Sequence, residues 1–186
     1  ALGKSVKAAI AAGIPVVSMN SGSDDYASLG ISAHVGQTEF EAGVGGGQKM
    51  KAAGGKKALC VNHEVGNVAL DRRCAGFKKG FGGSVDILGT SNDPTEIQKA
   101  VAAKLGGGYD TILTLGAGLS GEAALKALEA AGKVGNVKLG TFDMSPNMLK
   151  AAAAGKVEFL IDQQQYLQGY LPIAIFAQYM RWGTMP

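Results

Sequence analysis

The sequence predicts an α/β fold in which parallel sheets are flanked by helices on both sides. Three observations lead to this prediction. Short segments rich in Val, Ile and Leu alternate with amphipathic helical segments along the 186 residues. The short segments are apolar throughout, which is typical of strands buried on both faces. Many of the 29 glycines stand at segment ends, where tight turns and helix C-caps are needed.

The first half of the chain is expected to contain six elements. In order they are helix 2–12, strand 15–19, strand 31–35, helix 38–53, strand 57–61 and helix 68–81. Gly13 ends the first helix, and Thr38 is placed to cap the second. The three glycines at 45–47 disfavour that second helix, because each costs roughly 1 kcal/mol relative to alanine. Apolar residues three and four apart give the third helix a buried face.

The second half is expected to contain eight elements. They are strand 85–88, helix 94–105, strand 111–115, helix 119–131, strand 137–142, helix 145–154, strand 157–161 and helix 165–181. Asp93 as N-cap and Pro94 at the first helical position mark the start of helix 94–105. The last helix contains the apolar run 167–180, which is too short to span a bilayer and includes Pro172. We therefore expect that helix to be buried, and the protein not to be membrane-embedded.

Composition excludes several classes of protein. Hydrophobic residues at 46% and charged residues at 18% indicate a globular rather than a disordered chain. The net charge of +3 comes from scattered Lys and Arg residues, which argues against a nucleic-acid partner. His34 and His63 have no partners at metal-ligand spacing, so we expect structural roles for both and no metal.

The two cysteines leave two possibilities open. Cys60 lies on an expected strand and Cys74 on the helix that follows it. The pair forms either a disulfide in an oxidising compartment or two buried thiols. Neither cysteine has the surroundings of a catalytic nucleophile.

Function is expected at the carboxyl ends of the strands, where open α/β sheets bind ligands. The residues there are Asn20-Ser21, Asn62-His63-Glu64, Gly116-Ala117-Gly118, Asp143 and Asp162-Gln163. They are mostly amides, carboxylates and glycines, without a nucleophile–base pair. We therefore expect a binding protein rather than an enzyme.

A glycine motif raises the alternative of a dinucleotide site. Residues 116–121 read G-A-G-L-S-G between an expected strand and helix, and Asp143 follows at about the distance the fingerprint requires. However, the fingerprint normally occupies the first strand–turn–helix of its domain, and here several units precede it. No hydride-transfer site follows either. An NAD-binding enzyme is therefore only a minor alternative, and we expect no cofactor.

Several segments together resemble the type I periplasmic sugar-binding proteins, the ribose-binding-protein-like receptors of ABC importers. The segments are "AAGIPVVSMNSG" (11–22), "VGQTEFEAG" (35–43), "CVNHEVGNVALDRRCAGF" (60–77), "KLGTFDMSPNMLKA" (138–151) and "FLIDQQQYLQGY" (159–170). The resemblance implies a two-lobed fold with a hinge. Residues 1–36 with 163–186 would form the first lobe, and 37–162 the second. It also implies a fragment that lacks the N-terminal part of the first lobe and a C-terminal closing segment.

The resemblance implies a function as well. The protein would be a monomeric solute receptor that closes over a sugar or polyol and delivers it to an ABC transporter permease. Its location would be periplasmic, or extracellular and lipid-anchored in a single-membrane bacterium. An alternative with the same fold is the ligand-sensing core of a lactose-repressor-type transcription regulator.

Six residues match ligand positions of the family. They are Asn20, Asn67, Asp71, Ala117, Asp143 and Gln163. Asp71 stands where ribose receptors carry arginine and Ala117 where they carry asparagine, which argues against a ribose-identical pocket. At Ala117 only the backbone of 116–118 would reach a ligand. Aromatic stacking is also expected in the family, and Tyr26, Phe142 and Tyr166 lie near suitable positions.

Four of these residues also have a purely structural interpretation. Asp143 could cap helix 145–154, and Asn67 could cap helix 68–81. Asp71 could pair with Arg72 or Arg73 on the surface, and Gln163 could satisfy hinge backbone groups. The sequence leaves these alternatives open.

Overall fold

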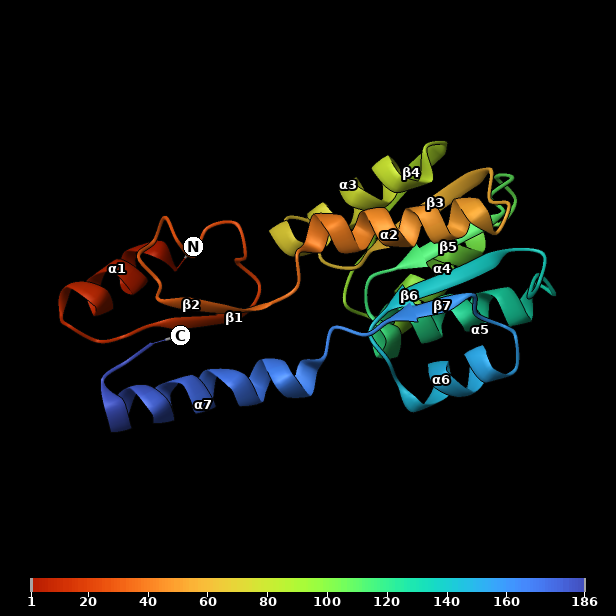
Figure 1. Cartoon of the computed structure of the whole chain (residues 1–186). Coiled ribbons are helices and arrows are strands. Elements are labelled where there is room, and N and C mark those ends of the chain that lie inside the picture. Colours follow the sequence, from red (N-terminus) through yellow and green to blue (C-terminus); the bar gives the residue numbers. More distant parts are fainter. Residues whose placement is uncertain (1, 186) are drawn as a thin grey trace. The chain divides into compact units, whose positions relative to one another are not determined.

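The computed structural model describes residues 2–185, which form two compact units (Figure 1). The smaller unit comprises Ala1–Thr38 with Gln163–Pro186, and the larger comprises Glu39–Asp162. The chain therefore passes from one unit to the other twice, once after Thr38 and once after Asp162.

The larger unit is built on a five-stranded sheet in which all neighbouring strands are parallel. Its strands are β3 (Lys57–Asn62), β4 (Ser84–Gly89), β5 (Thr111–Thr114), β6 (Lys138–Phe142) and β7 (Phe159–Ile161). They lie in the order β4-β3-β5-β6-β7. All of β5, and all of β3 after its first residue, is buried. The prediction of an α/β fold with buried parallel strands is confirmed.

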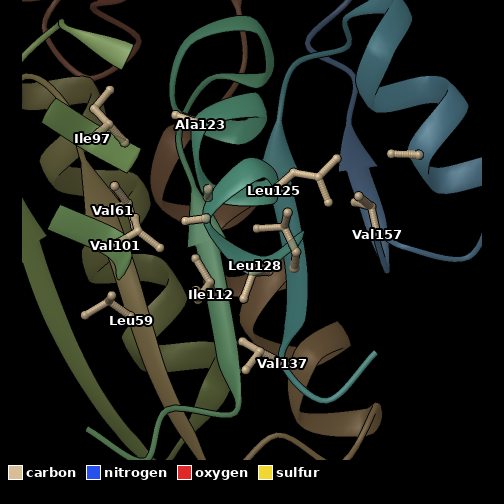
Figure 2. Packing of buried hydrophobic residues seen from close by; sticks show 14 of the residues in the cluster. Leu59, Val61, Ile97, Val101, Ile112, Ala123, Leu125, Leu128, Val137 and Val157 are labelled. Atoms are coloured by element: carbon tan, nitrogen blue, oxygen red, sulfur yellow. The ribbon is translucent and has the colours of Figure 1, made fainter. Parts of the chain in front are cut away.

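Helices cover both faces of this sheet (Figure 1). One face carries α2 (Glu39–Ala52) and α3 (Val68–Phe81), and the other α4 (Pro94–Lys104), α5 (Glu122–Ala130) and α6 (Pro146–Ala153). Alternate residues of each strand serve opposite faces. Leu59 and Val61 of β3 pack with Ile97 and Leu128 of α4 and α5, as Figure 2 shows. Cys60, between them, belongs to the core beneath α2 and α3.

In the smaller unit, the described residues 2–38 and 163–185 form two helices and two strands. They are α1 (Gly3–Ala11), the parallel strands β1 (Val17–Asn20) and β2 (Ala33–Gly36), and α7 (Gln165–Trp182). The expectation that α7 is buried is wrong in this structure, since Tyr170, Ile173 and Met180 are 57%, 68% and 81% exposed. The helix is apolar around its circumference, and a two-stranded sheet covers only part of it.

Most element boundaries lie within two residues of those predicted. The Asp93 cap is confirmed, since its carboxylate accepts hydrogen bonds from the backbone N–H groups of Thr95 and Glu96. Helix 119–131 is the exception, because it begins as a π-helical turn, η1 (Ala117–Gly121), before α5. The reason is a wide first turn in which the N–H of Gly121 donates to the carbonyl oxygen of Gly116 over 2.9 Å.

Helices α2 and α3 touch backbone to backbone through glycines. Gly43 and Gly47 of α2 face Gly76 and Gly80 of α3. A Cβ atom at Gly76 would lie 2.0 Å from the carbonyl oxygen of Phe40, and a Cβ at each of the other three would lie within 2.4 Å of a backbone oxygen. Of the three glycines at 45–47, Gly47 therefore allows α2 to pack closely on α3, together with Gly43.

A disulfide fastens α3 to the central strand. Cys60 of β3 and Cys74 of α3 are bonded, with their Cα atoms 5.9 Å apart, and both are fully buried. Of the two alternatives that the sequence leaves open, the structure contains the disulfide. The bond closes a short loop that includes the end of β3 and the first two turns of α3.

We predict that Gly76→Ala lowers the free energy of unfolding by about 1–3 kcal/mol, because the new methyl group forces α2 away from α3. Urea unfolding measures the change. Gly45→Ala is the matched control on α2, because a Cβ there meets nothing within 4 Å. Its higher helix propensity should stabilise the protein by up to about 1 kcal/mol. Equal effects of the two substitutions would contradict the close packing.

We predict that reduction of the disulfide costs roughly 3 kcal/mol, the value expected for a loop of this length. Reduction keeps both sulfur atoms, so it leaves no cavity from a deleted side chain. Equilibrium unfolding in urea with and without reductant measures the loss. The Cys60→Ala/Cys74→Ala variant is the control and should not respond to reductant. Two titratable thiols in the denatured, unreduced protein would refute the bond.

Candidate functional site

The strand order of the larger unit marks one place where a ligand would bind. From β3 the chain goes to β4 on one side of β3 and then to β5 on the other side. The loops that follow β3 and β5 therefore diverge at the carboxyl edge of the sheet. Open α/β sheets bind ligands at such a switch point. The residues there are 62–64 after β3 and 116–118 after β5.

Polar side chains at the end of β3 form one connected group. Asp71 accepts a hydrogen bond from Nδ2 of Asn62 through its Oδ1 over 2.7 Å. The Asn62 side-chain oxygen in turn accepts from the backbone N–H of Glu64 over 3.0 Å. A surface pairing of Asp71 with Arg73 is wrong, because Arg73 is buried and paired elsewhere. Asp71 is thus oriented by the strand end and has a second carboxylate oxygen at an exposed position.

Asn67 joins the same group and caps α3. Its side-chain oxygen accepts from the backbone N–H of Ala69 over 3.0 Å, which confirms the capping interpretation. Its Nδ2 donates to Oε2 of Glu64 over 3.1 Å. A role in ligand binding would have to use the remaining hydrogen-bonding capacity of this amide.

The glycine motif after β5 forms a turn packed against the sheet. Ala117 is 1% exposed and belongs to the core, so its side chain faces away from solvent. The Gly116 carbonyl oxygen accepts from the N–H and Oγ of Ser120 and from the N–H of Gly121. A Cβ at Gly121 would lie 3.1 Å from Oγ1 of Thr141. The glycines therefore serve a tight turn and close helix–strand packing.

Asp143 follows β6 in a backbone conformation that few residues adopt. Its φ is +67°, in the left-handed region that only Gly, Asn and Asp tolerate well. Its backbone N–H donates to the carbonyl oxygen of Ile161 over 2.9 Å, which fixes it to β7. The interpretation of Asp143 as the cap of α6 is wrong, because Ser145 is the cap and accepts from the N–H of Met148. Strained backbone of this kind clusters at functional sites.

An ion pair that the sequence did not indicate lies beneath this edge. The Arg73 guanidinium donates from Nε to Oε2 of Glu39 over 2.6 Å and from Nη2 to Oε1 over 3.1 Å. Its Nη1 donates to the Leu115 carbonyl oxygen over 3.0 Å, and its Cζ lies 4.5 Å from the ring centroid of Phe142. Both charged side chains are about 5% exposed. Phe142 is fully buried, so it is unavailable for stacking on a ligand.

The two candidates in the smaller unit belong to one network of amides. Asn20 has a φ of +64°, and its Nδ2 donates to Oε1 of Gln168 over 3.1 Å. Gln168 donates to the backbone oxygen of Gln163 over 2.6 Å. Gln37 donates to Oε1 of Gln163 over 3.1 Å. Gln168 thus connects Asn20 to Gln163. Gln168 was not among the residues that the sequence predicted for the site.

The aromatic candidates in the smaller unit are engaged with other rings. Tyr26 stacks on His34 with centroids 5.7 Å apart. Tyr166, 81% exposed, stacks on Tyr170 with centroids 6.2 Å apart.

Residues 2–185 contain no helix with the length and apolar character needed to cross a membrane. Within the same range no three His, Cys, Asp or Glu side chains are grouped so as to hold a metal ion.

We predict that Glu39→Gln lowers the free energy of unfolding by about 3–5 kcal/mol, because it leaves the buried Arg73 charge without its counterion. Chemical denaturation provides the measurement. Glu129→Gln is the control. It removes an ion pair in which Nζ of Lys156 lies 2.7 Å from Oε1 of Glu129, and both of these side chains are over 40% exposed. That change should cost less than about 1 kcal/mol. Similar losses in both variants would contradict the importance of the buried pair.

The chain is similar to several solved structures. A carbohydrate transporter protein from Acidothermus cellulolyticus, in complex with myo-inositol, is 33% identical over 98% of the chain, with a TM-score of 0.92. The chain spans 64% of that protein.

More distant structures share the fold. A periplasmic sugar-binding protein from Legionella pneumophila is 24% identical, with a TM-score of 0.84, over all of this chain and 71% of its own. A solute-binding protein from Actinobacillus succinogenes with bound D-allose is 20% identical, with a TM-score of 0.80, over all of this chain and 69% of its own.

A comparison with curated proteins gave no match. The similarities to solved structures favour neither the regulator nor the NAD-binding alternative. Residues 1–184 match the profile of the periplasmic binding protein domain. The chain therefore belongs to the periplasmic binding protein domain family.

Proposed function

We propose that the protein is a non-enzymatic solute receptor of an ABC importer and that it binds a sugar or a cyclic polyol. The observation that carries the proposal is the set of hydroxyl-binding groups at the switch point, in a chain of this family. Asp143 and Asp71 supply carboxylates there, Asn67 supplies an amide, and the buried Asn62 orients Asp71. The 33% identical protein in complex with myo-inositol supports a polyhydroxylated ligand.

The chemistry of these groups fits such a ligand. A carboxylate accepts hydrogen bonds from two neighbouring hydroxyls, and these charge-assisted bonds are stronger than neutral ones. An amide donates and accepts at once, as a hydroxyl does. Asp143 is half-buried, and a hydrogen bond to a carboxylate is stronger where water is partly excluded.

The proposal includes a movement of the two units. We assign the smaller unit to a first lobe and the larger unit to the second lobe. Asn20, Gln163 and the amides around them would contribute first-lobe contacts to the ligand. The two passages of the chain, after Thr38 and after Asp162, would act as the hinge. The closed form would then be presented to a permease by a monomeric receptor.

The buried disulfide supports the compartment that this function requires. Disulfides persist in oxidising compartments such as the bacterial periplasm and the cell surface, and they are rare in the cytosol. A receptor of this type would work in the periplasm, or outside a single-membrane cell through a lipid anchor. The Cys60–Cys74 bond fits either location.

Calorimetric titration and thermal shift on the purified protein test the proposal. The ligand panel is myo-inositol, other cyclic polyols, pentoses and hexoses, with NAD as a comparison. At least one polyol or sugar should stabilise the protein, by about 2.7 kcal/mol at 100 times its Kd. Stabilisation by NAD and by no polyol or sugar would overturn the proposal.

We predict that Asp143→Asn weakens binding of the best ligand at least tenfold, since hydrogen bonds to a charged group contribute about 1.5–3 kcal/mol. The fold should be preserved, because Asn tolerates a positive φ. Calorimetry gives the affinity, and urea unfolding gives the stability. Asp86→Asn on the exposed face of β4 is the control and should bind normally. Unchanged affinity in Asp143→Asn would remove Asp143 from the site.

A further inference from the structure

His63 lies at the switch point, on the opposite side of Gly116 from Asp143. His63 directly follows β3, Gly116 belongs to the loop after β5, and Asp143 directly follows β6, with β5 between the other two strands. A Cβ at Gly116 would lie 3.3 Å from Cε1 of His63, 3.7 Å from its Nε2 and 3.7 Å from Oδ2 of Asp143. The His63 ring and the Asp143 carboxylate therefore both border the point above Gly116 that a Cβ atom would occupy. A ligand atom cannot lie at that point, which is within bonding distance of the Gly116 Cα, but a glycine at 116 leaves the space beyond it without a side chain of its own.

The fold makes little use of the polarity of this imidazole. Nδ1 of His63 is buried and has no hydrogen-bond partner among residues 2–185. Rotation of the ring by 180° exchanges Nδ1 with Cδ2 and Nε2 with Cε1. Since Cε1 and Nε2 both border the point above Gly116, Nε2 faces that point in either orientation.

Burial lowers the pKa of His63, and the charge of Arg73 acts in the same direction, while Glu64 and Asp143 oppose them. The imidazole is therefore neutral at neutral pH, with one nitrogen that donates and one that accepts.

We propose that His63 is a ligand-contacting residue of the same site, and that its Nε2 shares one hydroxyl of a polyol with Asp143. This inference rests on the proposed function. The hydroxyl donates its hydrogen to Oδ2 of Asp143 and accepts the Nε2–H of His63. The hydroxyl then both donates and accepts a hydrogen bond, and the two partners fix its orientation.

The shared hydroxyl makes His63 a determinant of specificity. A ligand without that hydroxyl leaves the Nε2–H of the imidazole without this acceptor in a partly buried site. Sites built to bind a hydroxyl reject analogues that lack it much more strongly than apolar pockets reject a missing methylene. His63 and Asp143 together therefore select for a hydroxyl at one position of the ring.

Calorimetric titration of His63→Ala with myo-inositol and its monodeoxy derivatives tests the inference, with the best sugar of the panel as a substitute if that binds more tightly. In the wild type, removal of the shared hydroxyl should weaken binding at least tenfold. In His63→Ala the parent ligand should bind at least tenfold more weakly, and the same deoxy derivative should lose less than threefold further. Asp86→Asn, exposed on β4, is the control and should stay within twofold of the wild type.

Each outcome decides a different point. A wild type that binds no member of the panel overturns the proposed function and this inference with it. A wild type that binds, together with a His63→Ala variant of equal affinity and equal discrimination, overturns this inference alone.

If His63→Ala does not fold, imidazole ¹⁵N NMR of the wild type replaces it. The chain has only two histidines, so His34→Gln assigns the signals. Saturation with ligand should shift the Nε2 signal of His63, and an unchanged signal would exclude the contact.

Discussion

The buried ion pair between Arg73 and Glu39 is the interaction on which the arrangement of the larger unit depends. The guanidinium of α3 holds the first residue of α2, the carbonyl oxygen of Leu115 after β5 and the ring of Phe142 at the end of β6. Burial of two charges costs several kcal/mol unless every donor and acceptor is used. A different arrangement of α2, α3, β5 and β6 would leave part of this buried charge without a partner and would therefore be destabilising.

The same contacts position the candidate ligand residues. Asp71 lies two residues before Arg73 on α3, Gly116 directly follows Leu115, and Asp143 directly follows Phe142. Each is thus one or two residues from Arg73 itself or from a residue that its guanidinium contacts. The disulfide and the glycine contacts between α2 and α3 act on the same helix from its other sides. These contacts hold the candidate ligand residues in place before a ligand binds, as pre-organised binding requires.

Local signals in the sequence predicted the fold, and contacts between distant residues limited what could be predicted of the site. Apolar strands and the Asp93 cap follow from neighbouring residues, so their positions were correct. The partner of Arg73 is 34 residues away, and nothing near Arg73 in the sequence indicates burial. The strand-end rule selected the loops that the proposed site uses, including the one that contains His63, but it could not show which side chains in them lie close together. The exposure of α7 depends on how much sheet is available to cover it, which no local pattern records.

The positive φ of Asp143 and Asn20 restricts how these two positions can change. The left-handed backbone conformation costs most residues roughly 1–2 kcal/mol, whereas it costs Asp, Asn and Gly little. Asp and Asn have the same shape but differ in charge and in the ability to donate. Each position can thus exchange a charged acceptor for a neutral amide while the loop keeps its course. An Asp-to-Asn or Asn-to-Asp exchange at these two positions can therefore change which ligand groups are bound without lowering the folding stability.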